Sequence, residues 1–214
     1  MNKNNNLFTY ATGELSQDAF LCWLFSYLMK DADEEPTLKT CATDFIKQFI
    51  PEILDEQDVW LSEAPKKQYK SIDVLLTVND KYKIIIEDKT YTSEHDDQLN
   101  RYLEIVRKDF KDYIPIGIYF KIGFQSNLNN VIKNGYKPYG REKILETLER
   151  YVNKTNNLIF KSYYETIKSF DDEVKKYKFL PVSEWNWAQI NGFYNDIKFE
   201  IEQEKNMYCN YGYV

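Results

Sequence analysis

The sequence predicts an α/β domain in which a central mixed four-stranded sheet is flanked by helices, with a helical C-terminal extension. Three observations predict this class. Two β-branched, apolar runs at 71–78 and 82–89 are separated by Asn-Asp-Lys, which is a hairpin signal. The run 113–121 is apolar throughout, as expected of a strand that is covered on both faces. Segments with helical spacing lie before, between and after these strands.

Two helices are expected before the sheet. In the segment 14–29, Ser16 is the expected N-cap, and apolar residues surround the helix on almost every side, so it should be largely buried. The segment 38–50 has its apolar residues at helical spacing, and Pro51 ends it. The stretch 58–64 is then expected to form a short strand.

A third helix and a fourth strand follow the hairpin. Ser93 is expected to cap a helix over 94–110, with Asp96 at the capping-box position. The apolar run 113–121 supplies the fourth strand. The order up to residue 121 is therefore helix, helix, three strands, helix, strand.

The C-terminal part is expected to be helical and to pack on the core. Three helices are expected there, at 141–152, 157–177 and 183–203. Ser183 is the expected cap of the last one. The final residues, 206–214, have the pattern of a strand without a partner, which indicates that the natural chain continues. We therefore expect a core over 1–124 and a helical extension over 125–214.

Composition limits the kind of protein. The chain has 214 residues, of which 43% are hydrophobic and 16% aromatic, as in a globular protein with one core. No apolar run approaches the roughly 20 residues of a membrane span, so we expect a cytoplasmic protein. The net charge of -6 is unlike that of proteins that coat DNA, so any contact with nucleic acid would be local. The three cysteines lack C-x-x-C spacing, which gives no support to a disulfide frame or a zinc site.

Four charged residues lie on segments that otherwise have the pattern of core strands: Asp73, Glu87, Asp88 and Lys89. Because side chains alternate along a strand, Glu87 and Lys89 share one face and Asp88 points to the other. A three-residue hairpin loop would place Asp73 directly opposite Glu87. A two-residue loop would place Ile86 there, and local turn chemistry slightly favours that shorter loop. Both registers are open at this point.

The first register would bring two carboxylates together. Two carboxylates about 5 Å apart on facing strands are costly to ionise unless a cation lies between them. Mg²⁺ takes one or two carboxylates, completes its shell with water and accepts a phosphate oxygen. Lys89, on the same face, could hold or deprotonate an attacking water and stabilise charge on the phosphate. An acid-x-base triplet alone is weak evidence, since roughly four occur by chance in a chain of this composition.

The helix after the hairpin adds a further pair, Gln98 and Tyr102, which are four residues apart and therefore on one face. Together, Asp73, Glu-Asp-Lys at 87–89 and this Gln-x-x-x-Tyr resemble the active-site signature of the PD-(D/E)XK nuclease superfamily, in the arrangement found in its RecB-like branch. The αβββαβ order is also similar to the core of that superfamily, a restriction-endonuclease-like fold. The resemblance covers roughly residues 12–122.

The first helix and one departure complete the resemblance. The stretch "GELSQDAFLCWLFSYL" is similar to the opening helix of one branch of the superfamily, and by position its acidic residue is Glu14. Ile72 stands where a proline commonly precedes the aspartate, which is harmless in a strand. The C-terminal part carries no motif that identifies a substrate.

The resemblance implies a metal-dependent nuclease that hydrolyses phosphodiester bonds, with DNA as the expected nucleic-acid partner. It implies that Asp73 and Glu87 ligate Mg²⁺ or Mn²⁺, with the backbone carbonyl of Asp88 available as a further ligand. Glu14 would contribute to the same metal site. Lys89 would position the nucleophilic water.

The resemblance also gives roles to the helix after the hairpin. Gln98 would hold Lys89 or a substrate phosphate, and Tyr102 would contact the backbone or pack the site. Arg101 and Lys108 could meet phosphates, although interleaved acidic residues favour a solvated face for them. A homodimer or a protein partner is left open.

Other interpretations fit parts of the pattern. Asp73, Glu87 and Lys89 could form a solvent-facing salt-bridge ladder on the hairpin, and Glu14 could be an ordinary acidic residue before a helix. The same fold could also be a catalytically silent nucleic-acid-binding or regulatory module, for example in phage defence. A helix-rich interaction protein would require the other hairpin register. The intact Asp73, Glu87 and Lys89 favour the enzyme.

Overall fold

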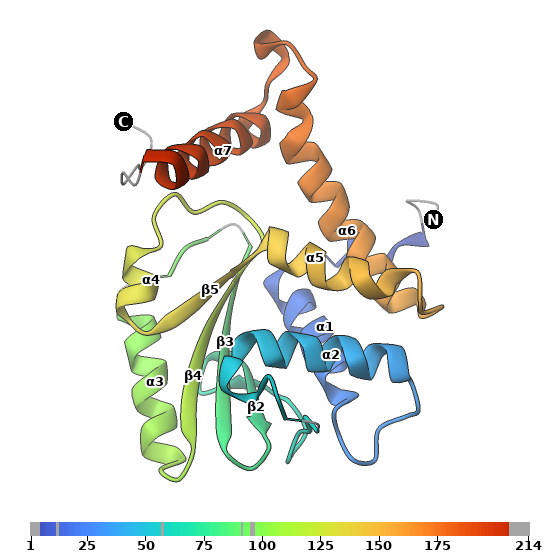
Figure 1. The fold of residues 1–214 in the computed structure, drawn as a ribbon, viewed down its shortest axis with the longest axis vertical. Helices are drawn as coiled ribbons and strands as arrows, with labels where there is room; N and C mark the ends of the chain where they lie inside the picture. Colours follow the sequence, from blue (N-terminus) through green and yellow to red (C-terminus); the bar gives the residue numbers. More distant parts are fainter. Residues whose placement is uncertain (1–4, 12, 57, 91, 95–96, 206–214) are drawn as a thin grey trace.

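A mixed five-stranded sheet lies at the centre of the computed structural model, which describes residues 5–11, 13–56, 58–90, 92–94 and 97–205 (Figure 1). The strands are β1 (Lys66–Tyr69), β2 (Ile72–Val78), β3 (Tyr82–Lys89), β4 (Ile114–Lys121) and β5 (Tyr136–Gly140), and they lie in this order in the sheet. β1, β2 and β3 run antiparallel, whereas β3, β4 and β5 run parallel. The predicted α/β class with a mixed sheet is confirmed, with one strand more than expected.

Helices cover both faces of this sheet. The described helices are α1 (Glu14–Ser26), α2 (Pro36–Phe49), α3 (Gln98–Asp109), α4 (Asn129–Lys133), α5 (Arg141–Val152), α6 (Leu158–Lys175) and α7 (Trp187–Lys205), of which all but α7 pack on the sheet. Short 3-10 turns lie at Leu7–Thr9, Pro51–Ile53, Lys176–Lys178 and Val182–Glu184. α1, α2, α5 and α6 pack on one face, and α3 and α4 on the other (Figure 1). None of the described helices is both long and apolar enough to cross a membrane.

The register of the central hairpin is the one that the three-residue loop requires. Val78 pairs with Tyr82, and the pairs that follow keep this register toward the end of β3. The loop residues at 79 and 80 both adopt the left-handed conformation, with φ of 51° and 50°. Asn and Asp tolerate that conformation better than most residues, so the loop needs no glycine. The preference of local turn chemistry for the shorter loop was therefore wrong, and Asp73 lies level with Glu87.

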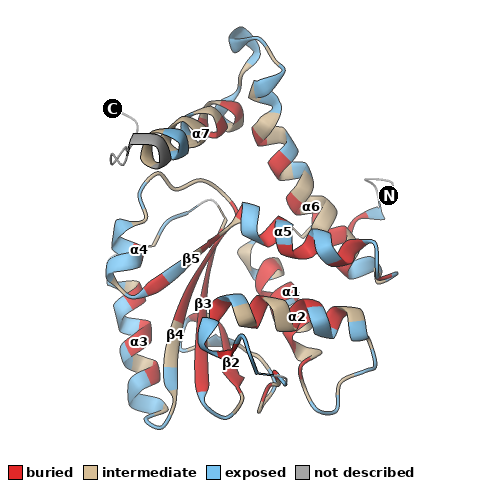
Figure 2. Ribbon diagram, in the orientation of Figure 1, coloured by how far each residue is buried: buried red, intermediate tan, exposed pale blue. Residues whose placement is uncertain are grey.

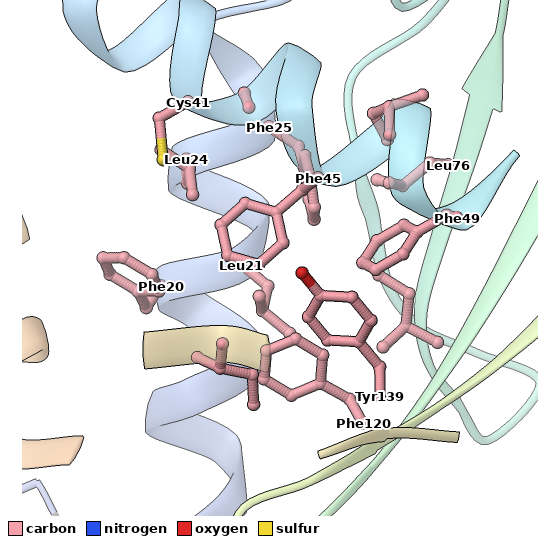
Figure 3. Close-up of a cluster of buried hydrophobic side chains, with 14 of the residues drawn as sticks. Phe20, Leu21, Leu24, Phe25, Cys41, Phe45, Phe49, Leu76, Phe120 and Tyr139 are labelled. Atoms are coloured by element: carbon pink, nitrogen blue, oxygen red, sulfur yellow. The ribbon is translucent and has the colours of Figure 1, made fainter. Parts of the chain in front are cut away.

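The larger core cluster joins α1 and α2 to the parallel part of the sheet (Figure 3). The rings of Phe25 and Phe45 meet edge to face with their centroids 6.2 Å apart. Phe45 also packs on Tyr139 of β5 at 5.8 Å, and Tyr139 stacks on Phe120 of β4 at 5.8 Å. Aromatic contacts of this kind add to the apolar area that they bury. The helices that precede the hairpin are thereby fixed against strands that follow it.

The smaller core cluster holds α3 and α4 on the opposite face. One close approach in it depends on a glycine: a Cβ on Gly117 of β4 would lie 2.8 Å from the ring of Tyr136 on β5. The Tyr136 ring can therefore approach β4 this closely only because position 117 has no side chain. Figure 2 shows the resulting burial, with the central strands red and the solvent faces of the outer helices pale blue.

Two helix starts near the sheet differ from the expected ones. α1 begins at Glu14 with Gly13 as its N-cap, three residues before the expected cap Ser16. α3 begins at Gln98 with Asp97 as its N-cap, later than a cap at Ser93 would place it. The expected capping-box residue at 96 lies outside the described residues. Neither observed N-cap makes a side-chain hydrogen bond to its helix.

The C-terminal helices follow the prediction more closely. α5 has the predicted bounds, and α6 begins after Asn157, whose side chain accepts two backbone hydrogen bonds as a cap. Ser183 lies in a 3-10 turn instead of capping α7, which begins at Trp187. α6 runs away from the sheet and α7 folds back above its end (Figure 1), where Lys198 donates to the carbonyl of Ser126. The strand predicted for 206–214 lies outside the described residues.

The two edge strands are the main differences from the predicted sheet. The stretch 58–64 contributes only a single bridge, between Leu61 and Val78, and the first strand is β1 instead. β1 is short and charged, as edge strands often are, and it therefore lacks the apolar pattern of a buried strand. β5 contains Pro138, which an edge strand tolerates. Because β5 lies beyond residue 124, the sheet continues into the part of the chain that was predicted to be a helical extension.

Candidate active site

The charged end of β3 lies deep in the molecule. Glu87 and Asp88 have no exposed surface, and Lys89 is 8% exposed. Burying an ionised group is costly unless partners compensate it, so each of these side chains should have a defined environment. The alternation predicted for the strand is present, since Glu87 and Lys89 contact each other on the face of α3 whereas Asp88 faces α1. A solvent-facing salt-bridge ladder is therefore excluded.

Four of the predicted site residues meet on the α3 face. The Lys89 ammonium lies 2.6 Å from Glu87 Oε1. Gln98 Nε2 donates to the same Glu87 oxygen at 2.8 Å and is 3.0 Å from the hydroxyl of Tyr102. Because Gln98 and Tyr102 are one helical turn apart, α3 presents both to the end of β3. Gln98 thus holds Glu87, where the resemblance implied that it would hold Lys89 or a phosphate.

Asp73 joins this group from the neighbouring strand. Its Oδ2 accepts the backbone N–H of Asp88 at 2.9 Å, and its Oδ1 accepts from Gln68 Nε2 at 3.1 Å. Burial, and then the negative charge of Asp73, raise the pKa of Glu87 to about 8, while Lys89 acts in the opposite direction. The Asp73 carboxylate is therefore close enough to oppose the ionisation of Glu87.

A second acidic pair, Asp88 and Asp18, lies on the α1 face of the same strand end. Gln17 donates to one oxygen of Asp88, and Tyr163 donates to Gln17 at 3.1 Å. Burial, and then Asp73, raise the pKa of Asp18 to about 7. Of Asp88 only the backbone carbonyl was predicted as a ligand, and Asp18 was not predicted to belong to the site. The available signal was the spacing of Asp18, one helical turn after Glu14.

Glu14 reaches the residues that follow β3. Its Oε1 accepts the backbone N–H of Thr90 at 2.9 Å and the hydroxyl of Thr92 at 3.1 Å. Burial lowers the pKa of Lys89, but Glu87, Asp73 and then Glu14 together raise it above its ordinary value. Glu14 is thus at the edge of the group, and the part in the metal site that the resemblance implied for it stays a prediction.

The two predicted phosphate contacts differ in position. Both Arg101 and Lys108 are exposed on α3. The Arg101 guanidinium lies 5.5 Å from the centre of the Tyr102 ring, so it adjoins the site. Lys108 comes ten residues after Gln98, which places it about 15 Å farther along the helix axis. Lys108 is therefore not brought to the site.

The acidic group offers the oxygen ligands that a hard divalent cation prefers. Glu87 Oε2 is buried and has no hydrogen-bond partner among the described residues, and Asp73 opposes it. The described residues hold no set of three His, Cys, Asp or Glu side chains that could hold a metal ion. Mg²⁺ commonly takes only one or two carboxylates and retains water, whereas zinc sites need three or four protein ligands. The donor set therefore fits Mg²⁺ or Mn²⁺ better than zinc.

The comparison with protein families agrees with this geometry. A family model described as PD-(D/E)XK nuclease superfamily matches residues 5–195. The chain belongs to the PD-(D/E)XK nuclease superfamily. The match extends from the turn before α1 to the middle of α7, well beyond the segment that carries the sequence motifs. No significant match was found to a curated protein or to a solved structure.

Membership of the PD-(D/E)XK superfamily gives the site a chemical context. The superfamily is one of nucleases, which are hydrolases of nucleic acids, and its members generally use divalent metal ions. A carboxylate pair with a neighbouring ammonium group suits such chemistry, because the reaction needs a cation near the phosphate and a group that holds water. In this PD-(D/E)XK protein, those groups lie at the end of β3, where Asp73 joins them from the neighbouring antiparallel strand β2.

Proposed function

We propose that this PD-(D/E)XK protein is a cytoplasmic, Mg²⁺-dependent nuclease that hydrolyses phosphodiester bonds in DNA. The supporting observation is the geometry at the end of β3. Half-buried Asp73 lies level with buried Glu87 on the neighbouring strand, and Lys89 lies 2.6 Å from Glu87. One Glu87 oxygen has no hydrogen-bond partner among the described residues. Burying charged side chains this close together costs folding free energy, unless a bound cation and a phosphate compensate the charges.

Asp73 and Glu87 would hold the metal ion in this proposal. When bound, Mg²⁺ or Mn²⁺ supplies charge that polarises the phosphoryl oxygen and lowers the pKa of water. The carbonyl of Asp88 and the carboxylate of Glu14 are the further ligands proposed at the edge of the site. Burial and the charge of Asp73 raise the pKa of Glu87, so metal binding by Glu87 should be coupled to loss of a proton from its carboxyl group.

Lys89 would hold the water that attacks phosphorus. Its ammonium is fixed by Glu87 and is 8% exposed, so its position is set before substrate arrives. Its positive charge would also stabilise the negative charge that develops on the phosphate oxygens. Gln98 and Tyr102 would act through Glu87, because Gln98 bridges the two side chains. This Gln-x-x-x-Tyr contact is our basis for placing the chain in the RecB-like branch.

Contact with DNA would be local. Arg101 is the proposed phosphate contact, since it is exposed beside Tyr102, and Lys108 would have at most a weak role. The net charge of -6 opposes broad binding to a polyanion, so few phosphates should be neutralised. We therefore expect affinity for DNA to fall only gently as salt rises.

A cleavage assay tests the proposal. The purified chain is incubated with plasmid DNA, single-stranded DNA or RNA in Mg²⁺, Mn²⁺ or EDTA. Lys89→Ala should lower the cleavage rate at least about 100-fold, because the change removes the group that holds water and faces the phosphate. Lys39→Ala, a change at an exposed lysine of α2, is the matched control and should cleave like the wild type.

The outcomes separate the candidate functions. Metal-dependent cleavage of DNA that Lys89→Ala abolishes supports the nuclease. Cleavage of RNA alone would show that the proposed substrate, DNA, is wrong, whereas the proposed reaction, phosphodiester hydrolysis, would stand. Binding without cleavage would favour the silent nucleic-acid-binding or regulatory module, and the absence of both would defeat the proposal.

A further inference from the structure

A second buried lysine lies beside the site and has no role in the signature. Lys121 is the last residue of β4 and is the register partner of Lys89 on β3. Register partners on neighbouring strands project to the same face of a sheet, so the two ammonium groups leave the same strand ends together. Lys121 is 5% exposed. In the sequence, Lys121 could have been recognised as a lysine at the end of a mostly apolar strand, which is also the position of Lys89.

The ammonium of Lys121 contacts the residues that follow β3. It donates to the carbonyl of Thr92 and, at 3.4 Å, to the carbonyl of Thr90. The same two threonines hold Glu14, through the N–H of Thr90 at 2.9 Å and the hydroxyl of Thr92 at 3.1 Å. Lys121 therefore reaches Glu14 through Thr90 and Thr92, which lie between them.

Packing alone does not account for a lysine at this position. Burying an ammonium group is costly, and an apolar side chain of similar length would fill the same volume without that cost. Burial lowers the pKa of Lys121 to about 8, although Glu14 and Asp88 favour its charged form. The benefit that offsets this cost must come from what the ammonium holds, namely the two threonine carbonyls.

We propose that Lys121 is a positioning residue that fixes Thr90 and Thr92 so that they hold Glu14 at the metal site. The inference rests on the proposed function, because it gives Glu14 a place beside the metal ion. Without the ammonium group, the two carbonyls lose their donor, and Thr90 and Thr92 no longer present their N–H and hydroxyl groups to Glu14 in one arrangement. Residues that orient ligands in this way typically change metal affinity about 10- to 100-fold when they are removed.

The sign of the effect distinguishes this role from simple electrostatics. If Lys121 only added positive charge near the carboxylates, its removal would make the site more negative and would tighten the binding of a divalent cation. If it positions Glu14, its removal weakens that binding. Isothermal titration calorimetry of the full chain with Mn²⁺, in the absence of nucleic acid, measures whether removal of Lys121 tightens or weakens metal binding.

The titration uses a double-mutant cycle. Lys121→Met and Glu14→Gln should each weaken Mn²⁺ binding about tenfold or more, and the double variant should bind no worse than the weaker single variant, because both changes break one network. Lys121→Arg should restore part of the affinity. Lys137→Met is the matched control, since Lys137 also donates to a backbone carbonyl, that of Phe49 at 3.2 Å, on an exposed part of β5.

A second variant, at an exposed residue, tests the same network without changing a buried side chain such as Lys121. Thr92 is exposed, so Thr92→Val removes the hydroxyl that bonds Glu14 with little risk to the core. It should also weaken Mn²⁺ binding, and its effect should not add to that of Glu14→Gln. Unchanged or tighter binding in Lys121→Met, or additive effects in the cycle, would overturn the positioning role. A wild type that neither binds Mn²⁺ nor cleaves nucleic acid would instead overturn the proposed function itself.

Discussion

Replacing Asp18 by Asn should make the metal-free protein less sensitive to pH. The Asp18 side chain is 1% exposed, and its Oδ1 has no hydrogen-bond partner among the described residues. Burial, followed by the charge of Asp73, raises its pKa from 3.8 to about 7. The folded state therefore holds this proton more tightly than the unfolded state. The stability that protonation contributes is fully present below about pH 4 and is lost as the pH rises through 7.

The size of the effect follows from the shift. At about 1.4 kcal/mol for each pKa unit, a rise from 3.8 to about 7 corresponds to at most about 4 kcal/mol in the free energy of unfolding. Asn has nearly the same shape and keeps an oxygen that can accept from Gln68, but it cannot ionise. At about pH 8 the variant should therefore be more stable than the wild type by up to about 4 kcal/mol, and at about pH 4 by less than about 1 kcal/mol.

Urea unfolding in EDTA at several pH values measures this difference. Asp33→Asn, at an exposed aspartate, controls for the loss of one negative charge and should leave the pH dependence of the wild type unchanged. A difference between Asp18→Asn and the wild type that is the same at low and high pH would refute the reasoning, because it would show that Asp18 titrates alike in the folded and unfolded chains.

Three further predictions concern the site and the packing that supports it. Gln98→Ala removes a hydrogen bond to Glu87 and should slow metal-dependent cleavage about 10- to 100-fold, measured as the steady-state rate, with no large loss of stability. Phe45 is 1% exposed, so Phe45→Ala leaves a cavity in the core and should lower the free energy of unfolding by about 3 to 5 kcal/mol. Urea unfolding measures this change, and a loss under about 1 kcal/mol would contradict the described core. Gly117→Ala places a Cβ 2.8 Å from the Tyr136 ring and should lower the free energy of unfolding by about 1 to 3 kcal/mol. A second change of Tyr136 to a smaller residue should restore part of this loss. Wild-type stability in the single variant would contradict the contact.

Much of the fold could be predicted because its signals are local. The hairpin strands and β4 lie where runs of apolar residues predicted them, and α5 has its predicted bounds. β1 and β5 could not be found in the same way. β1 is short and charged, and β5 contains Pro138, so both form by pairing with a neighbouring strand without an apolar pattern of their own.

The candidate site was predictable to the extent that it lies in one stretch of sequence. Alternation along β3 gave the faces of Glu87, Asp88 and Lys89, and helical spacing gave the shared face of Gln98 and Tyr102. The sequence did not decide the length of the hairpin loop. Local turn chemistry favoured the two-residue loop, and only the packed sheet favoured the three-residue loop.

The sequence by itself determined the central strands, most helices and the order of the charged residues, because the periods of helices and strands are properties of a few neighbouring residues. Only the tertiary structure decided which of these residues meet. Glu14 contacts Thr90, 76 positions away, and Lys121 contacts the same segment from 31 positions away. Such contacts depend on how α1 and β4 pack on β3, and packing is set by the whole core, so no local pattern reports it.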